Sequence, residues 1–237
     1  MAKLTEGPVA VLTGAGISAE SGVPTFRGED GLWRNFRPEE LATPEAFRRD
    51  PTLVWEWYGW RRSLIAPCAP NSAHETLAEM EAVLSDFTLI TQNVDGLHQA
   101  AGSRDVVALH GDIWSLRCTA CGETMTDRRV PLREIPPRCP ACRGLLRPDV
   151  VWFGESLSPR VLEAAWLAAT VCRTMLVIGT SAVVQPAASL PIIALRTGAH
   201  LIEVNPAETP LSRRAHEVLR GPAAEVLPRW WTAHRPP

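Results

Sequence analysis

The chain has 237 residues, of which 46% are hydrophobic and 21% are charged, and its formal net charge is −2. This length accommodates one large domain, or a large domain with a smaller one. The balanced charge argues against a surface for nucleic acid or another polyanion, and the apolar runs are too short to span a membrane. We therefore expect a globular protein with no direct nucleic-acid partner and no membrane partner.

The first predicted element is a buried strand at Val9–Leu12 that runs into a glycine-rich turn. Gly14, Gly16 and Ala19 fit the G-x-G-x-x-G/A pattern, in which small residues allow the backbone to approach a pyrophosphate. A helix that begins in the following polar segment would direct free N–H groups at an anion. An ordinary turn between a strand and a helix has the same pattern, so these residues alone leave both interpretations open.

Three more apolar runs have the length of buried strands, at Phe87–Thr91, Met175–Ile178 and Leu201–Val204. Each run ends in a polar turn that a helical pattern follows, and this alternation predicts an α/β fold with a doubly wound parallel sheet. Ligands of such sheets bind beyond the carboxyl ends of the strands. Those ends carry four polar clusters in this chain, at Gly14–Gly16, Gln92–Asp95, Gly179–Ser181 and Asn205.

Two segments interrupt the alternation of strands and helices. Pro51–Ala66 predicts a helix rich in Trp and Arg, and Ser72–Glu75 resembles a capping box at the start of the next helix. Arg117–Arg147 contains four cysteines and shows little periodicity. We predict a Rossmann-like nucleotide-binding domain from residues 1–37, 70–116 and 148–237, with a smaller module from residues 38–69 and 117–147.

The smaller module carries two CxxC pairs, Cys118/Cys121 and Cys139/Cys142, separated by seventeen residues. Each CxxC turn lets two sulfurs converge, and four thiolates complete a tetrahedral zinc shell. The segment has too few apolar residues for a core of its own, so we expect one structural Zn²⁺ with no open position for catalysis. The first residues lack the apolar core of a secretion signal, so we expect a cytoplasmic protein, in which the alternative of two disulfides is disfavoured.

The remaining cysteines, Cys68 and Cys172, lie outside the CxxC pattern, and we expect them to be buried as small apolar residues.

Candidate catalytic groups lie at two of the predicted strand ends. His110 follows the apolar run Val106–Leu109, and an imidazole titrates in the range that suits proton removal near neutral pH. A single histidine is more often structural, so its position alone does not decide its role. The amide and carboxylate groups of Gln92, Asn93 and Asp95 share one turn, where they either bind a ligand or cap a helix near Gly96.

The segments GAGISAESGVPTFRG, Thr91–Asp95 and Leu109–Gly111 resemble those of the sirtuins, the NAD-dependent protein-lysine deacylases. Matching pieces run from Gly14 to Ala223, almost the whole chain. The resemblance implies that NAD is the cosubstrate and that His110 and Asn93 are catalytic. In the family the base acts on a ribose hydroxyl, after the acyl oxygen has attacked the anomeric carbon.

The resemblance also implies where NAD binds. Phe26 and Arg27 match a loop that covers the nicotinamide pocket, and Gly221–Ala223 match a loop beside adenine. The chain has no acidic residue after the second strand to bind the ribose hydroxyls, and Asn205 takes that place. The complete set of expected NAD contacts is Gly14, Ala15, Gly16, Glu20, Thr25, Phe26, Arg27, Trp33, Gln92, Asn93, Asp95, Gly179, Thr180, Ser181, Asn205 and Ala223.

The expected substrate contacts come from two further segments. Val151, Trp152, Phe153, Gly154 and Glu155 resemble the sirtuin strand that pairs with a substrate peptide, although a core strand ending at Gly154 is an equal alternative. Trp55–Arg62 resembles the signature of sirtuins that remove acidic acyl groups.

In that signature Arg61 would bind a terminal carboxylate and Tyr58 would add a donor, while Ala42 would leave room for the acyl chain. An amphipathic helix with an interfacial Tyr and a solvated Arg is the alternative interpretation of this pair.

The resemblance therefore implies an enzyme that transfers acetyl, succinyl or malonyl groups from lysine to ADP-ribose and releases nicotinamide. Its partners would be acylated-lysine proteins, and we expect a monomer. Two alternatives remain, a mono-ADP-ribosyltransferase and a non-catalytic sensor of NAD or ADP-ribose. The sensor requires a defective catalytic set, whereas His110, Asn93 and Asp95 are all present.

Overall fold

The structure is a computed structural model, and it describes residues 7–25 and 41–236. The predicted NAD contacts Phe26, Arg27 and Trp33 lie outside these residues. None of the helices in the described part combines the length and apolar character that a membrane crossing requires. In chain order the elements are β1 (Val9–Thr13), η1 (Ala15–Ser21), α2 (Pro44–Arg49), α3 (Pro51–Ile65), α4 (Ser72–Val83), β2 (Phe87–Thr91), α5 (Leu97–Ala100), β3 (Val106–Ala108), β4 (Gly111–Cys118), β5 (Thr124–Thr126), β6 (Leu146–Val150), α6 (Pro159–Val171), β7 (Thr174–Ile178), η2 (Ala187–Ser189), α7 (Leu190–Arg196), β8 (His200–Val204), β9 (Glu217–Leu219) and α8 (Ala223–His234).

The large sheet has six parallel strands in the order β3-β2-β1-β7-β8-β9. The predicted α/β fold is therefore confirmed, and the four predicted strands are β1, β2, β7 and β8, three of them longer by one residue. The chain moves outward from β1 in both directions, so the order reverses between β1 and β7. A crevice forms at such a reversal, outside the carboxyl ends of the two strands.

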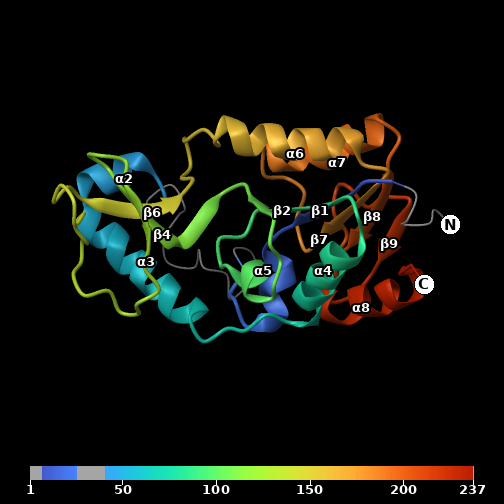
Figure 1. Ribbon diagram of the computed structural model, residues 1–237, viewed down its shortest axis with the longest axis horizontal. Helices are drawn as coiled ribbons and strands as arrows, with labels where there is room; N and C mark the ends of the chain where they lie inside the picture. The colour runs from blue at the N-terminus through green and yellow to red at the C-terminus, as the bar shows by residue number, and fades with distance from the viewer. Residues whose placement is uncertain (1–6, 26–40, 237) are drawn as a thin grey trace.

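Two helical layers cover the large sheet (Figure 1), with α6 and α7 on one face and α4 and α8 on the other. β1 and β7 are buried along their whole length because both faces are covered. Alternate residues of β1 accordingly enter different cores: Val9 and Val11 pack in the layer of α4 and α8, whereas Ala10 and Leu12 pack in the layer of α6 and α7.

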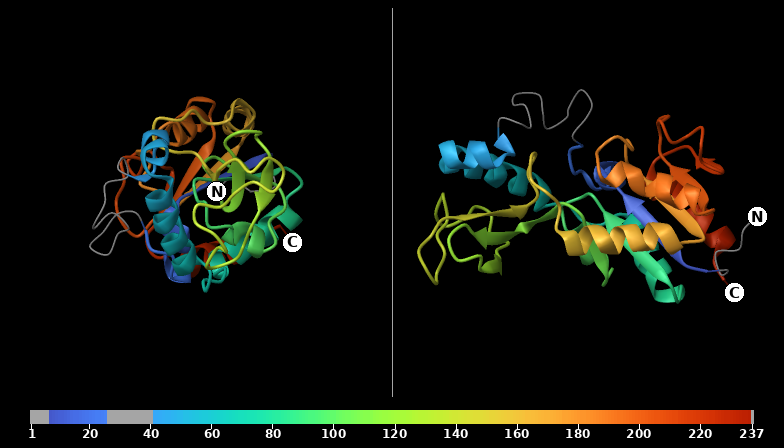
Figure 2. Two further views of the ribbon diagram at one scale, coloured as in Figure 1. Left: turned by 90° about the vertical axis from the view of Figure 1, so that its left-hand side faces the viewer. Right: turned by 90° about the horizontal axis from the view of Figure 1, so that it is seen from above.

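A small unit, formed by α2 and α3 (residues 44–65) with β4, β5 and β6 (residues 111–150), lies beside the large sheet (Figure 2). Its three strands are antiparallel, in the order β5-β4-β6. The apolar core that the cysteine segment lacks comes from α3, whose Trp55 and Trp57 pack with Ile113 and Leu146. Two distant parts of the sequence thus share one core.

One local prediction at a helix start is wrong. The helix that follows Gly14 is the tight 3-10 helix η1, as a helix was expected there. The capping box of α4 begins at Asn71, not Ser72: the Asn71 side chain accepts from Ala73 N, and the Asn71 N–H is 3.3 Å from His74 Nδ1. A histidine replaces the Glu or Gln of the usual pattern, so the sequence motif was displaced by one residue.

Glycine residues bring the turns after β1 and β7 into backbone contact. Gly16 N donates to Gly179 O at 2.8 Å. Gly179 has φ of +60°, and a Cβ there would lie 2.3 Å from Ile17 N. The turns after β1 and β7 are therefore held at a fixed separation, and moving either one would widen the crevice between these strands.

We predict that Gly179→Ala destabilises the fold by more than about 2 kcal/mol, since a left-handed residue alone costs about 1–2 kcal/mol and the backbone clash adds to it. Gly198→Ala is the matched control, because Gly198 also has positive φ (+89°) but has nothing within 4 Å of the added atom. Urea unfolding of both variants measures the difference. Equal losses of unfolding free energy would show that the backbone contact is not tight.

Candidate active site

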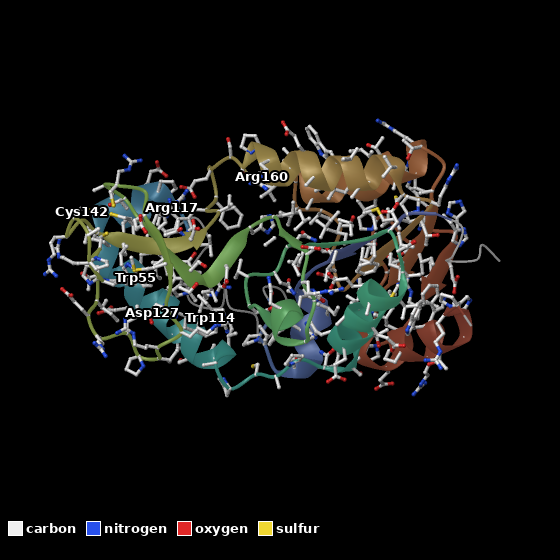
Figure 3. All side chains as sticks on the ribbon, viewed as in Figure 1. Trp55, Trp114, Arg117, Asp127, Cys142 and Arg160 are labelled. Carbon is white, nitrogen blue, oxygen red and sulfur yellow. The ribbon has the colours of Figure 1, made fainter. Side chains whose placement is uncertain are left out.

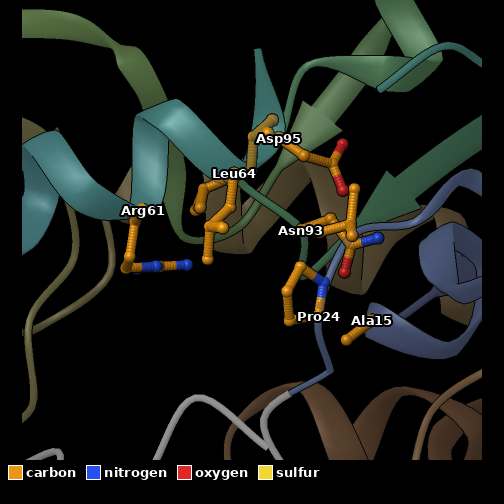
Figure 4. Close-up of a pocket in the computed structure, with 9 residues that line it drawn as sticks. Ala15, Pro24, Arg61, Leu64, Asn93 and Asp95 are labelled. Atoms are coloured by element: carbon orange, nitrogen blue, oxygen red, sulfur yellow. The ribbon is translucent and has the colours of Figure 1, made fainter. Parts of the chain in front are cut away.

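A pocket open to solvent lies between the carboxyl ends of the large sheet and α3 of the small unit (Figure 4). One wall is the turn after β2, and the opposite wall is the last two turns of α3. Figure 4 shows the Arg61 side chain extending from α3 toward Pro24. The lining residues are Ala15, Val23, Pro24, Arg61, Leu64, Ile65, Asn93, Val94 and Asp95.

The polar wall of the pocket is fixed by hydrogen bonds between three segments. Asn93 Nδ2 donates to Gly14 O at 3.1 Å and to Ser18 Oγ at 3.2 Å, and Ser18 Oγ donates to Asp95 Oδ2 at 2.8 Å. The other Asp95 oxygen accepts from Leu97 N at 2.9 Å, at the start of α5. Asp95 therefore accepts from the first N–H of α5 with one oxygen, and its carboxyl group also lines the pocket. Burial raises its pKa above the usual value.

Behind this wall lies a buried polar layer that sequence reasoning missed. Thr13 Oγ1 donates to Thr91 Oγ1 at 2.8 Å and is 2.9 Å from His98 Nε2, while Thr91 Oγ1 accepts from Asn93 N at 3.1 Å. The ring of His74 lies 4.9 Å from that of His98. Burial lowers the pKa of His74 to about 4 and that of His98 to about 3. Both imidazoles are therefore neutral near pH 7 and stabilise the wall by hydrogen bonds rather than by charge.

His110 lies in the turn between β3 and β4, as the sequence predicts for a residue after Val106–Leu109. Its Nδ1 is 2.9 Å from Gln92 O. A carbonyl oxygen only accepts, so Nδ1 carries the hydrogen and Nε2 is the basic nitrogen. Burial lowers the pKa of His110, and the hydrogen bond to Gln92 partly opposes this effect. His110 is thus neutral and oriented, as a general base requires.

Most of the other predicted NAD contacts lie beyond the carboxyl ends of β1, β2, β7 and β8. Gln92 Nε2 donates to Thr180 Oγ1 at 2.9 Å, and Asn205 Nδ2 donates to Thr180 O at 2.9 Å. Glu20 accepts from Ala224 N at 3.2 Å and so connects η1 to the start of α8 beside Ala223. Gly14, Ala15, Gly16, Gly179 and Ser181 complete the same edge, and Thr25 is the last described residue before the gap.

Tyr58 and Arg61 are both buried on α3, with 2% and 6% of their surfaces exposed. The alternative of a solvated Arg61 is therefore wrong. The Arg61 guanidinium lies 5.0 Å from the ring centre of Trp57 and 5.6 Å from that of Tyr58. Burial lowers the pKa of Arg61, while Tyr58 and Asp95 raise it, and a guanidinium keeps its charge in proteins. The pocket wall therefore carries a buried cation.

The segment Val151–Glu155 does not form the expected strand. β6 ends at Val150, and a turn follows at Phe153 and Gly154. Four backbone N–H groups are already used within the chain. Val151 N donates to His110 O, Trp152 N to Glu155 Oε2 and Phe153 N to Ala42 O, each at 2.9 Å, and Glu155 N donates to Trp152 O at 3.0 Å. The segment thereby connects the predicted base with the buried Ala42.

The four CxxC cysteines meet at the end of the small unit, where Figure 3 labels Cys142. Their sulfurs all lie within 4.8 Å of one another, and Cys118 Sγ lies 3.4 Å from Cys142 Sγ. A disulfide is about 2.05 Å long, so the disulfide alternative is wrong. Zinc–sulfur bonds of about 2.3 Å in a tetrahedron place sulfurs about 3.8 Å apart, and the cluster fits that geometry. Cys172 is buried as expected, and Cys68 is half-buried.

Comparisons with known proteins extend over both parts of the structure. A model of the Sir2 family matches residues 14–186. The NAD-dependent protein deacylase of Aquifex aeolicus is 58% identical over 207 residues, which are 87% of this chain and 87% of that protein. A crystal structure of a Sir2 homologue in complex with NAD superimposes with a TM-score of 0.92 at 50% identity, covering 98% of this chain and 91% of the other. A Sir2 structure with a p53 peptide and NAD⁺ superimposes with a TM-score of 0.84 at 33% identity, covering 97% and 95%.

We predict one zinc ion per chain at the cysteine cluster, measured by elemental analysis. Cys139→Ser, or removal of the metal with a strong chelator, should lower the thermal unfolding temperature and the cooperativity of unfolding, because metal binding and folding are coupled in such units. Cys68→Ser is the control: that cysteine lies outside the cluster, so the zinc content should not change. A metal-free protein with full stability and activity would contradict a structural zinc.

Proposed function

The chain belongs to the Sir2 family and is an NAD-dependent protein deacylase, and on this premise we propose how its residues divide the work. The acyl group of an acylated lysine is transferred to the ADP-ribose part of NAD, and nicotinamide is released. The observation that carries the proposal is the turn after β2: Gln92 O orients His110, while Asn93 and Asp95 line the pocket. One backbone turn thus holds the groups proposed for release of nicotinamide and the carbonyl that orients the proposed base.

Asn93 and Asp95 are proposed to bind the nicotinamide carboxamide, which needs both a donor and an acceptor. The Asp95 carboxyl group is held by Ser18 and Leu97, so it meets a ligand in a fixed orientation. The glycine turns after β1 and β7 suit the diphosphate because their backbones lack side chains that would block it. Asn205 and Ala223 are proposed to contact the adenosine ribose and the adenine.

His110 is proposed to remove a proton from a ribose hydroxyl through Nε2, once the acyl oxygen has bonded to the anomeric carbon. The fixed Nδ1 hydrogen bond leaves this nitrogen free of a proton. The zinc cluster supplies no chemistry in this scheme, because four thiolates complete its shell. Backbone carbonyls of Val151–Glu155 are proposed to receive the substrate peptide, the kind of ligand found in the related p53 peptide complex.

We predict that His110→Ala retains NAD binding but loses deacylation by about two to four orders of magnitude, the usual share of general base catalysis. Wild-type kcat/KM should fall only below pH 6.5, because burial lowers the pKa of His110 from that value and only the neutral ring accepts a proton. Mass spectrometry of the products measures the rate of deacylation in the variant and its pH dependence in the wild-type protein. Near-normal turnover of the variant would exclude His110 as the base.

The same product masses separate the alternative activities. ADP-ribose retained on protein would indicate a mono-ADP-ribosyltransferase. NAD binding by the wild-type protein without any turnover would indicate a sensor.

The buried Tyr58 and Arg61 support a finer proposal, that succinyl- and malonyl-lysine are accepted along with acetyl-lysine. A terminal carboxylate must leave water to enter the pocket, and this step is costly unless a cation receives it. Arg61 is a buried cation on the wall of the pocket. Ala42 is also buried, and its small side chain is proposed to leave room for the acyl chain.

We predict that Arg61→Met lowers kcat/KM for succinyl-lysine peptides by about 30-fold to several thousandfold, because breaking a desolvated charge pair costs about 2–5 kcal/mol. Matched acetyl-lysine peptides carry no carboxylate, so their turnover should change much less. The ratio of the two kcat/KM values is the measurement. An equal loss for both peptides would assign Arg61 to the fold and remove the acidic-acyl proposal.

A further inference from the structure

The Tyr58 hydroxyl has a partner in the segment that follows β6. Trp152 Nε1 lies 2.9 Å from the Tyr58 oxygen, and both side chains are buried. An indole nitrogen only donates, so the Tyr58 oxygen is the acceptor of this bond. The hydroxyl therefore cannot direct its own hydrogen at Trp152.

Arg61 lies beside the same phenol, with its guanidinium carbon 5.6 Å from the centre of the Tyr58 ring. Burial raises the pKa of Tyr58, so the phenol stays protonated near neutral pH. The indole N–H occupies one lone pair of the Tyr58 oxygen, and the hydroxyl hydrogen is left to donate to another group. A carboxylate beside the guanidinium is the acceptor that this arrangement fits.

Trp152 is itself held in place by an ion pair. The Arg147 guanidinium carbon lies 3.4 Å from the centre of the Trp152 ring, and Arg147 binds Glu155 through two nitrogens at 2.6 and 2.8 Å. Glu155 in turn accepts from Trp152 N at 2.9 Å. Phe47 packs against the same ring at 5.3 Å. These contacts leave the indole one orientation, with its N–H directed at Tyr58.

We propose that Trp152 is a specificity-determining positioning residue, whose indole N–H makes Tyr58 a donor toward an acidic acyl group. This inference rests on the proposed acceptance of such groups by Tyr58 and Arg61. It assigns a role to the Trp152 side chain, whereas the proposed peptide contact of this segment uses only its backbone. The ion pair of Arg147 and Glu155 contributes to this positioning, because it fixes the orientation of the Trp152 indole.

A merely structural Trp152 makes a different prediction from a positioning one. Loss of packing would lower turnover of all acyl peptides together. Loss of the N–H donor frees the Tyr58 hydroxyl to rotate, which matters only for a substrate that accepts its hydrogen.

The test is Trp152→Phe, which removes the N–H and keeps an aromatic ring. The ratio of succinyl to acetyl kcat/KM should fall about twofold to twelvefold, the net effect of one neutral hydrogen bond. Trp55→Phe is the matched control, because Trp55 lies in the same core but its Nε1 donates to Leu146 O; its ratio should stay at the wild-type value. An unchanged ratio in Trp152→Phe would overturn the inference.

A double-mutant cycle separates action through Tyr58 from an independent effect. If Trp152 acts through Tyr58, then Trp152→Phe should not lower the ratio further in the Tyr58→Phe background. Additive losses would overturn the inference. Arg61→Met in the same series tests the underlying function: a normal effect of Arg61→Met with no effect of Trp152→Phe rejects the positioning role alone, whereas an unchanged ratio in Arg61→Met rejects both.

A spectroscopic readout is independent of turnover because Tyr58 is the single tyrosine of the chain. The NMR signal of the ring carbon that bears the hydroxyl oxygen should shift in Trp152→Phe. An unshifted signal in a folded Trp152→Phe protein would show that the bond is not made in solution, and would overturn the inference.

Discussion

The close backbone contact between the turns after β1 and β7 is the constraint on which the site depends. Gly14 N donates to Ile178 O and Gly16 N donates to Gly179 O, so the two turns lie against each other without intervening side chains. Gly14 O then becomes available to Asn93 Nδ2, which fixes the polar wall of the pocket. The position of Asn93 in the polar wall therefore depends on the contact between the turns after β1 and β7. A side chain at Gly16 or Gly179 would separate the turns and release Asn93.

The helix α3 connects the metal cluster to the pocket because its two sides face different structures. On one side Trp55 donates to Leu146 O, and Arg62 donates to the carbonyl of Asp127, so the helix is part of the core of the small unit. On the other side Arg61, Leu64 and Ile65 line the pocket. A zinc ion bound by the four cysteines would stabilise the sheet against which this helix packs. One rigid helix therefore connects the cysteine cluster with the wall of the pocket.

The parts of the fold that sequence reasoning predicted are those that leave a local pattern. β1 and β7 are buried on both faces and appear as continuous apolar runs, and the CxxC spacing identifies the metal ligands directly. His110 and the Gln92–Asp95 turn were found because polar residues follow strands. β9 was missed because its three residues are half-buried and carry no apolar run.

The remaining features depend on contacts between residues far apart in the chain. Thr13 and His98 are separated by 85 positions, and Tyr58 and Trp152 by 94. No periodicity marks such pairs, since each partner alone resembles an ordinary core residue. The turn at Gly154 was also missed, because the Arg147–Glu155 ion pair that holds it requires the folded β6. The positions of these side chains therefore depend on hydrogen bonds between residues far apart in the chain, which local sequence patterns do not predict.

The buried imidazoles of His74 and His98 also set the acid limit of the fold. Their folded pKa values, about 4 and about 3, lie below the value of 6.5 expected in the unfolded chain. Above pH 6.5 both states are neutral, and their contribution to stability is fully present. As the pH falls toward the folded values, the unfolded chain takes up protons that the fold excludes, and each histidine removes about 1.4 kcal/mol per pH unit. The buried layer behind the wall of the pocket therefore loses stability as the pH falls below 6.5.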